Sequence, residues 1–587
     1  MQFRNISTYT AVVFLILLSS GCKKFLDQVP DDRVTIEEVF QKKQASEEYL
    51  ANVYSHIREQ GNQWTVNPFS GNTDELDVTW AKYSTYQLNI GSWNPTSLPF
   101  DIWGEQYKGI RSATYFINHI DGNEEILRLN GQQRIDQYKA EARFVRAYCY
   151  FALLRQYGPI VILGNEELAP DAPTADFQIP RSSYDESVEY IAGQLDSAAA
   201  VLPTSPAEDR DYGRATKGAA LALKARILLY AASPAFNGNA DYANFKNQDG
   251  KSLISGAYDT EKWKRAADAN KAVIDLNLYA LYKHASGDPV ESYRGILLDA
   301  YNGENIFSRR NNNLTDWDVH SMPRAAGGWC GMGATQEMVD AYFMKDGLPI
   351  TESSLYSENG FTDDIYNMYV NREPRFYASV NYHNRMIQGG NIITARRLNF
   401  FNGGTDGRYE GTEDYSKTGY LVWKNVSPNT NRITGQWYNR PNVLIRLGEI
   451  YLNYAEALNE YDYNSNQTEI LKYINLIRER AGIPQYGTGP DALPIPATQS
   501  EMRDKIRQER RIELAFESHR WFDIRRWKIA RDVMKPVHGM NCNGKDASAF
   551  FVRTEVTPRQ WRDAYMFYPL PQYEIDRGRL LVQNPGW

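Results

Sequence analysis

The spacing of apolar residues along the chain predicts long helices that pack in pairs. Within 440–484, apolar side chains recur at steps of three and four, which places them on one helix face: Leu444, Leu447, Tyr451, Tyr454 and Leu458. The same period continues in a second helix that ends near Gly482, with apolar positions at Ile470, Ile474 and Ile477. We expect an antiparallel helix hairpin, and the spacing of its first residues resembles the start of a tetratricopeptide (TPR) unit.

Such a hairpin cannot bury its apolar face alone, so further helix pairs are expected in the chain. The same period predicts helices over 35–61, 101–121, 135–157, 183–201, 214–232, 261–277 and 500–527. It is lost over 278–439, where Gly, Asn, Asp and Tyr dominate and only 336–344 has a helical pattern. The sequence therefore predicts a mostly α fold, in which TPR-like helix pairs form a right-handed scaffold beneath a loop-rich region.

The first 22 residues have the pattern of a secretion signal that ends at a lipid attachment site. Arg4 precedes an apolar run at 11–18, and small residues at 19–21 lead directly to Cys22. The run is too short to span a bilayer but suits the core of a signal peptide. We expect 1–21 to be removed and Cys22 to be acylated, with ordinary secretion and cleavage near Gly21 as the alternative.

Composition narrows the class of ligand. The net charge is −7 and no basic block occurs, which argues against nucleic acid as a partner. Aromatic residues make up 13% of the chain, with 40 Tyr and 13 Trp. They either fill a Tyr-rich core and surface or form a surface that stacks on flat ligands. The four Cys are far apart and make no CxxC pair, so neither a zinc site nor a disulfide framework is expected.

Several segments, in order, resemble the SusD/RagB family of outer-membrane nutrient-binding lipoproteins of the starch-utilisation-system type. They are KKFLD after Cys22, AEARFVRAYCYFALLRQYGPI at 140–160, KGAALALKARILLYAASP at 217–234, VLIRLGEIYLNYAEALNE at 443–460, ERRIELAFESHRWFDIRRW at 509–527 and YPLPQYEIDRGRLLVQNPGW at 568–587. The resemblance covers nearly the whole chain after residue 22.

The resemblance implies an N-terminal helical region over 22–277 and a C-terminal region over 278–587. The latter would consist of loops (278–439), helices (440–527) and a tail of turns (528–587). It also implies a surface-exposed protein, lipid-anchored in the outer membrane, that works with a SusC-like TonB-dependent transporter. Family members capture oligosaccharides or, in some cases, peptides; they are not enzymes and need no cofactor.

A sugar site needs aromatic faces for pyranose C–H groups, and amides, carboxylates or guanidinium groups for hydroxyls. Two predicted loop regions supply both. Their candidate ligand-binding residues are Asp74, Trp80, Trp93 and Asn94 in the first and Tyr301, Trp317, Arg324 and Trp329 in the second. Trp93 and Trp329 are the preferred pair, and we expect Ala at either to weaken binding without unfolding. Each Trp could instead pack its own loop. No metal site is predicted, since no ordered calcium-ligand spacing accompanies Asp74 and Asp77 or the loop at 311–313.

The charged segment 509–527 is either a solvated helix face or a partly buried ion-pair network, and we favour the network. Rival functions are a helical glycosidase using paired carboxylates, a TPR-like scaffold for a protein peptide, and a peptide-binding nutrient lipoprotein. The sequence contains no HExxH, GxSxG or P-loop motif. The peptide-binding lipoprotein is therefore the main alternative to a glycan-binding one.

Overall fold

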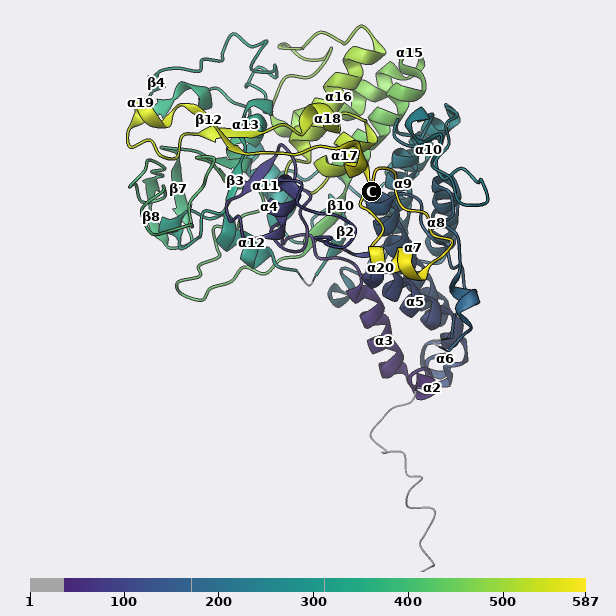
Figure 1. Ribbon diagram of the computed structural model, residues 1–587. Helices are drawn as coiled ribbons and strands as arrows, with labels where there is room; N and C mark the ends of the chain where they lie inside the picture. The colour runs from purple at the N-terminus through teal and green to yellow at the C-terminus, as the bar shows by residue number, and fades with distance from the viewer. Residues whose placement is uncertain (1–35, 170, 311) are drawn as a thin grey trace, which may run out of the picture.

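Helices that follow one another along the chain pack side by side in one half of the molecule (Figure 1). The computed structural model describes residues 36–169, 171–310 and 312–587, so the predicted lipidation site at Cys22 lies outside the described residues. The helices of this half are α2 (Ile36–Val39), α3 (Lys43–Ser55), α5 (Trp103–His119), α6 (Glu124–Asn130), α7 (Gln132–Tyr157), α8 (Tyr184–Ala199), α9 (Lys217–Ala232) and α10 (Glu261–Ile274). In these described ranges no helix is long and apolar enough to cross a membrane.

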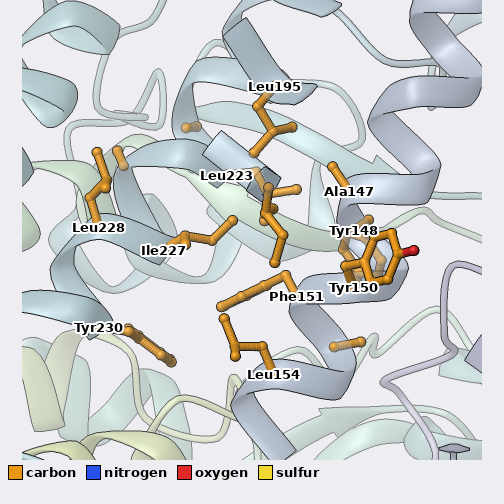
Figure 2. Close-up of a cluster of buried hydrophobic side chains, with 14 of the residues drawn as sticks. Ala147, Tyr148, Tyr150, Phe151, Leu154, Leu195, Leu223, Ile227, Leu228 and Tyr230 are labelled. Carbon is orange, nitrogen blue, oxygen red and sulfur yellow. The ribbon is translucent and has the colours of Figure 1, made fainter. Parts of the chain in front are cut away.

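The core of the helical half lies around α7. This helix is buried on nearly all sides because α5 and α8 flank it, and small residues such as Ala147 let the neighbouring backbones approach closely. Figure 2 shows the side chains that fill this space, where Phe151, Leu195 and Leu223 from three successive helices meet. Ser183 and Glu186 form a capping box at the start of α8, as its sequence predicts. Periodicity therefore predicted α5, α7, α8, α9 and α10 to within about three residues at each end, but it missed α6 and gave one helix over 35–61 where the structure has α2 and α3.

The hairpin predicted at 440–484 is confirmed, with one correction at its start. Residues Asn442–Arg446 form strand β10 and the helix begins at Leu447, because β10 pairs with β2, whose residues are remote in sequence. Helix α15 (Leu447–Ala481) has a non-helical residue at Asp462, where the chain reverses. The rings of Tyr451 and Tyr473 lie 4.8 Å apart, which a straight helix would separate by roughly 30 Å. The two arms therefore run antiparallel.

The other half consists of short helices, loops and strand pairs. Its helices are α4 (Ser84–Asn89), α11 (Pro289–Leu298), α12 (Leu314–Ser321), α13 (Gln336–Ala341), α14 (Pro374–Ser379), α16 (Gln499–Glu513), α17 (Arg520–Arg526), α18 (Ala530–Val533) and α19 (Ala547–Phe550). Near the end of the chain, α20 (Gln572–Arg577) returns to the helical half beside α5. The region 278–439 thus holds more helix than predicted, since α11, α12 and α14 are too short for a clear period. Ser500–Trp527 is not one helix, because Phe516 and Ser518 have positive φ and separate α16 from α17.

Strands of the described residues form two-stranded antiparallel pairs: β1 (Leu76–Val78) with β3 (Met332–Ala334), β2 (Asn305–Arg309) with β10, β4 (Phe361–Thr362) with β5 (Ile365–Tyr366), β6 (Val380–Asn381) with β9 (Leu421–Val422), β7 (Met386–Gly389) with β8 (Ile392–Arg397), and β11 (Val537–Met540) with β12 (Arg553–Thr557). Pairs this small are marginal alone and depend on the packing around them. They position loops rather than build a sheet core.

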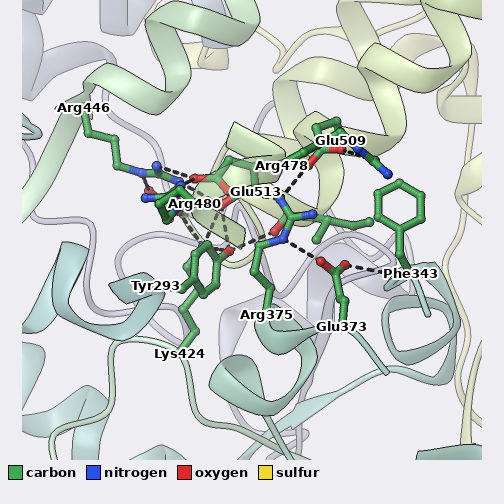
Figure 3. A network of polar contacts seen from close by, with 12 residues as sticks. Tyr293, Phe343, Glu373, Arg375, Lys424, Arg446, Arg478, Arg480, Glu509 and Glu513 are labelled. Atoms are coloured by element: carbon green, nitrogen blue, oxygen red, sulfur yellow. Dashed lines mark hydrogen bonds and ion pairs between the residues drawn. The ribbon is translucent and has the colours of Figure 1, made fainter. Parts of the chain in front are cut away.

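A buried ion-pair network joins α15, which packs against α9 and α10 of the helical half, to the loop-rich half (Figure 3). Glu513 on α16 lies among Arg446 at the end of β10 (2.7 Å), Arg375 on α14 (3.2 Å) and Arg480 on α15. Glu509 pairs with Arg375 and with Arg478 on α15. All these side chains are almost fully buried, which confirms the predicted network and excludes a solvated face. The charged signature segment is therefore structural.

Candidate ligand-binding site

The two loop regions that the sequence singled out are joined by a strand pair. β1 pairs with β3 so that Leu76 faces Ala334 and Val78 faces Met332. The N–H of Thr79 then donates to the carbonyl of Gly331 at 2.9 Å, so the backbones continue side by side into the loops beyond. This pairing places 78–83 next to 320–332, although about 240 residues of sequence separate them.

A row of aromatic rings runs from the interior toward the surface at this point. His320 stacks on Trp64 at 3.9 Å and meets the edges of Trp80 at 5.2 Å and Trp329 at 4.7 Å. Trp64 and Trp80 are buried, whereas Trp329 is only partly buried. Burial lowers the pKa of His320, which favours its neutral form. Trp329 is therefore the ring of this row that has surface to offer a ligand.

Arg324 fixes a neighbouring loop against the row. Its guanidinium donates to the carbonyls of Thr405 (3.0 Å), Gly407 (3.0 Å) and Asp414 (2.7 Å). The same group lies over the Tyr409 ring, 4.4 Å from the ring centre, and Tyr409 is 46% exposed. Arg324 thus holds the exposed ring of Tyr409 in place, and Tyr409 was not among the residues predicted for the site.

Arg432 was also missed, because nothing in the local pattern distinguishes it from other loop arginines. Its Nε donates to the carbonyl of Gly327 at 2.9 Å, and its guanidinium lies 5.8 Å from the centre of the Trp329 ring. We call the resulting patch the aromatic loop surface and define it by its rings and cations: Tyr83, Trp329, Tyr409 and Tyr415 with Lys82, Arg324, Arg408 and Arg432. An open hollow of about 480 Å³ lies beside it, lined in part by Arg396, Phe401 and Thr405.

Trp93 and Asn94 lie elsewhere. Trp93 is 4% exposed and packs against Tyr565 (4.6 Å), Tyr568 (4.9 Å) and Trp587 (4.7 Å) near the end of the chain. A sugar has no access to either ring face, so Trp93 belongs to the core and replacing it would leave a cavity. Asn94 is exposed, but its Oδ1 accepts from the N–H groups of Thr96 and Ser97 and so closes a turn.

Three more predicted contacts are structural. Trp80 is 3% exposed and its indole N–H donates to Asp414 at 2.9 Å. Trp317 is equally buried and donates to the carbonyl of Lys424 at 3.3 Å. The carboxylate of Asp74 is buried between Arg511 (2.6 Å) and Arg520 (2.8 Å), which leaves it no freedom to bind a sugar hydroxyl. These three residues stabilise the loops from the interior of the protein.

Tyr301 is separated from the others as well. It stacks on Tyr212 at 4.2 Å and lines a different cavity of about 210 Å³, together with Tyr279 and Asn302. The predicted site residues therefore do not form one cluster. Of that set, Trp329 and Arg324 come together, and ligand binding by them stays a prediction.

Glu75, next to Asp74, predicts an unusual pH dependence of stability. Burial and the neighbouring Asp74 carboxylate raise the pKa of Glu75 to about 8, and its Oε2 has no hydrogen-bond partner in the described residues. A folded pKa above the unfolded value of 4.5 contributes stability that is present below pH 4.5 and lost as the pH rises through 8.

We expect Glu75→Gln to remove this loss of folding stability at higher pH. The free energy of unfolding of the wild type, relative to the variant, should fall by up to about 1.4 kcal/mol per pH unit between pH 4.5 and 8. Urea unfolding of both proteins at several pH values measures the difference. A constant difference across that window would contradict a buried, proton-binding Glu75.

A cavity larger than the hollow beside the aromatic loop surface competes with that surface and lies on the helical half. It has a volume of about 610 Å³ and is lined mainly by apolar side chains of α5, of the segment after α7 and of the chain near α20, such as Tyr107, Leu163, Phe177 and Leu581. Lys108, Arg111 and Glu167 also line it. Although charged side chains are present, most of its wall is apolar, whereas the aromatic loop surface combines partly exposed rings with guanidinium groups, so we prefer that surface as the glycan site.

Comparison with known protein families decides the class of protein. The model described as "SusD family" matches residues 294–587, which is half of the chain. The chain belongs to the SusD/RagB family. A second model of the same kind, described as "Starch-binding associating with outer membrane", matches residues 24–229. The two matches leave out 230–293, which includes α10, and cover most of both halves.

Relatives and solved structures agree with this assignment. The chain is 26% identical to SusD-like protein P2 of Formosa agariphila over 501 residues, 83% of this chain and 80% of that protein. The solved structure of BT4246 has a TM-score of 0.81 at 26% identity, covering 93% of this chain and 99% of that one. A SusD-like protein from Bacteroides fragilis, BF3747, has a TM-score of 0.76 at 27% identity, covering 96% and 99%. A laminarin-binding SusD-like protein, 18% identical and covering 93% of this chain and all of that one, shares the fold with a TM-score of 0.58.

Proposed function

We propose that this protein is a cell-surface lipoprotein that binds a nutrient oligosaccharide at the aromatic loop surface and delivers it to a SusC-like TonB-dependent transporter. The observation that carries the proposal is the partly exposed Trp329 ring beside Arg432 and Arg324, on loops brought together by the β1–β3 pair. A partly exposed indole offers a flat apolar face, and nearby guanidinium groups offer hydrogen-bond donors. Together they provide the two kinds of contact that a pyranose needs.

The proposed role is capture without chemistry. Two acidic side chains of this surface are engaged, since Asp406 pairs with Arg396 at 3.0 Å and Asp414 accepts from the Trp80 indole, while the exposed Glu410 and Glu413 lie on one loop. A glycosidase needs two carboxylates free to face one glycosidic bond. This supports binding rather than hydrolysis, and it agrees with a family in which glycan-binding members such as the laminarin-binding protein occur.

Attachment to the outer membrane is proposed through acylated Cys22. The support is the signal-like sequence before it and the outer-membrane description of the family model that begins at residue 24. Two or more acyl chains on one Cys would hold the protein firmly. We propose that the body covers the mouth of the transporter barrel, which takes the ligand onward and supplies the energy for transport.

Calorimetry tests the proposal. The chain of residues 23–587, which keeps every described residue, is titrated with a panel of neutral and acidic polysaccharides and with oligopeptides. We expect saturable heat with one class of glycan, lost in Trp329→Ala. Heat with oligopeptides alone would support the peptide-binding alternative and contradict the proposed function.

A further inference from the structure

Each ring of the aromatic loop surface has the charged group of a Lys or Arg side chain over it. The distances from the charged group to the ring centre are 5.5 Å for Lys82 over Tyr83, 4.4 Å for Arg324 over Tyr409, 5.5 Å for Arg408 over Tyr415 and 5.8 Å for Arg432 over Trp329. These pairs come from four separate loops, so no helix period or strand alternation places them together. They lie on one surface although their residues are far apart in the sequence.

These four cations lack acidic partners. Arg324 donates only to backbone carbonyls, Arg408 donates to the side-chain carbonyl of Asn543, and Arg432 uses its Nε for Gly327. Within the residues that the structure describes, none of the four, Lys82 included, has a carboxylate oxygen within 4 Å, and both terminal amino groups of Arg432 have no protein partner. The surface therefore holds four cations that no carboxylate contacts directly.

Several interior arginines show the opposite arrangement. Arg375, Arg446 and Arg526 are each paired with glutamates at 2.5–3.2 Å. Buried Arg181 and Arg372 have no carboxylate partner among the described residues either and donate to carbonyl oxygens, whereas the four cations of the aromatic loop surface are exposed or half-buried and so within reach of a ligand. Guanidinium groups match carboxylates and sulfates in geometry and charge, and they also stack on aromatic rings.

We propose that the ligand of this surface is an acidic glycan, whose sugar units carry uronate carboxylates or sulfate esters. The inference rests on the proposed function, since it assumes that a glycan binds here. An aromatic ring would take the C–H face of a sugar unit, while the cation above that ring takes the anionic substituent of the same or the next unit. A repeating acidic glycan would match the repeated ring-and-cation pairs.

Two acidic residues of the same loops make it possible to test the sign of the ligand's charge. Glu410 follows Tyr409 and Glu413 precedes Asp414, and both are exposed and make no ion pair in the described part of the chain. Each would repel an acidic glycan. Removing their charge should strengthen binding, whereas removing the charge of Arg432 should weaken it.

The test compares charged and neutral forms of one polysaccharide. Residues 23–587 are titrated with polygalacturonate, alginate, chondroitin sulfate and carrageenan, and with neutral laminarin, starch and xylan. The polysaccharide that binds is then tested after reduction of its carboxyl groups or removal of its sulfate. We expect binding to an acidic polysaccharide, weakened at least about ten-fold by neutralisation, which corresponds to losing one charged hydrogen bond, and weakened by added salt. Whether reduction or desulfation abolishes binding tells carboxylate from sulfate.

Variants separate this inference from the proposed function. Arg432→Gln should weaken binding of the acidic polysaccharide about ten-fold, Arg432→Lys should retain most of it, and Glu410→Gln should increase it. Arg531→Gln, which removes an exposed arginine beside Asp563, is the matched control and should change nothing. Binding of neutral glycans alone, still lost in Trp329→Ala, would overturn the acidic ligand and keep the proposed function. Binding of no polysaccharide, or binding that Trp329→Ala leaves unchanged, would overturn both.

Discussion

Replacing Glu513 with Gln is expected to lower the free energy of unfolding by about 3–5 kcal/mol, the cost of leaving buried charges without their partner. The Glu513 carboxylate holds Arg375, Arg446 and Arg480 together from three different elements. Without its charge, these cations repel one another in a site that water does not reach. The change would therefore loosen the junction between the helical half and the loop-rich half.

The lowered pKa values of carboxylates in the same network predict that this stability is lost in acid. Burial alone would raise the pKa of Glu517, but Arg446 and Lys424 outweigh it and lower the pKa to about 2. A folded pKa below the unfolded value of 4.5 contributes stability that is present above pH 4.5 and lost as the pH falls toward 2. The wild type should thus lose stability across that interval.

Urea unfolding followed by circular dichroism measures the effect of Glu513→Gln. The matched control is Glu479→Gln, because Glu479 pairs with Lys283 at 2.7 Å while both side chains are about half exposed. An exposed pair of this kind contributes about 0–1 kcal/mol. Equal unfolding midpoints for Glu513→Gln and the wild type would show that the network does not hold the halves together.

The second large effect separates two tryptophans that look alike in the sequence. Trp93→Ala is expected to cost about 3–5 kcal/mol of stability, because it removes a large buried ring from between Tyr565, Tyr568 and Trp587. Trp329→Ala should cost far less, since that ring is only partly buried. It should instead weaken glycan binding by at least about ten-fold, as loss of a central aromatic contact does.

Thermal unfolding and calorimetric titration of both variants test this pair of expectations. Tyr258→Ala is the matched control, because Tyr258 is an aromatic residue that is 61% exposed on the helical half. It should leave both the melting temperature and the affinity unchanged. Loss of affinity in a folded Trp93→Ala protein, with none in Trp329→Ala, would reverse the assignment.

Much of the helical half could be predicted from the sequence because its signals are local. The period of α7 and the capping residues of α8 lie within single segments, so neighbouring residues suffice to identify them. The start of α15 could not be found this way. Leu444 fits a helix face as well as a strand, and its actual state depends on pairing of β10 with β2, more than 130 residues earlier.

The candidate site was less predictable for the same physical reason. Trp93 is buried by residues near the end of the chain, almost 500 positions away, and no local pattern marks that contact. Arg432 lies near the Trp329 ring only because its side chain donates to the carbonyl of Gly327, on another loop. Sequence reasoning identified the kind of residue that a glycan site needs, while tertiary contacts decided which of those residues reach the surface.

The most direct test of the central claim is a crystal structure of the protein bound to an oligosaccharide that calorimetry identifies as a ligand. We expect a sugar unit against the exposed face of Trp329, with Arg324 or Arg432 at its polar substituents. A ligand seated in the apolar cavity between α5 and α20, with the aromatic loop surface empty, would contradict it.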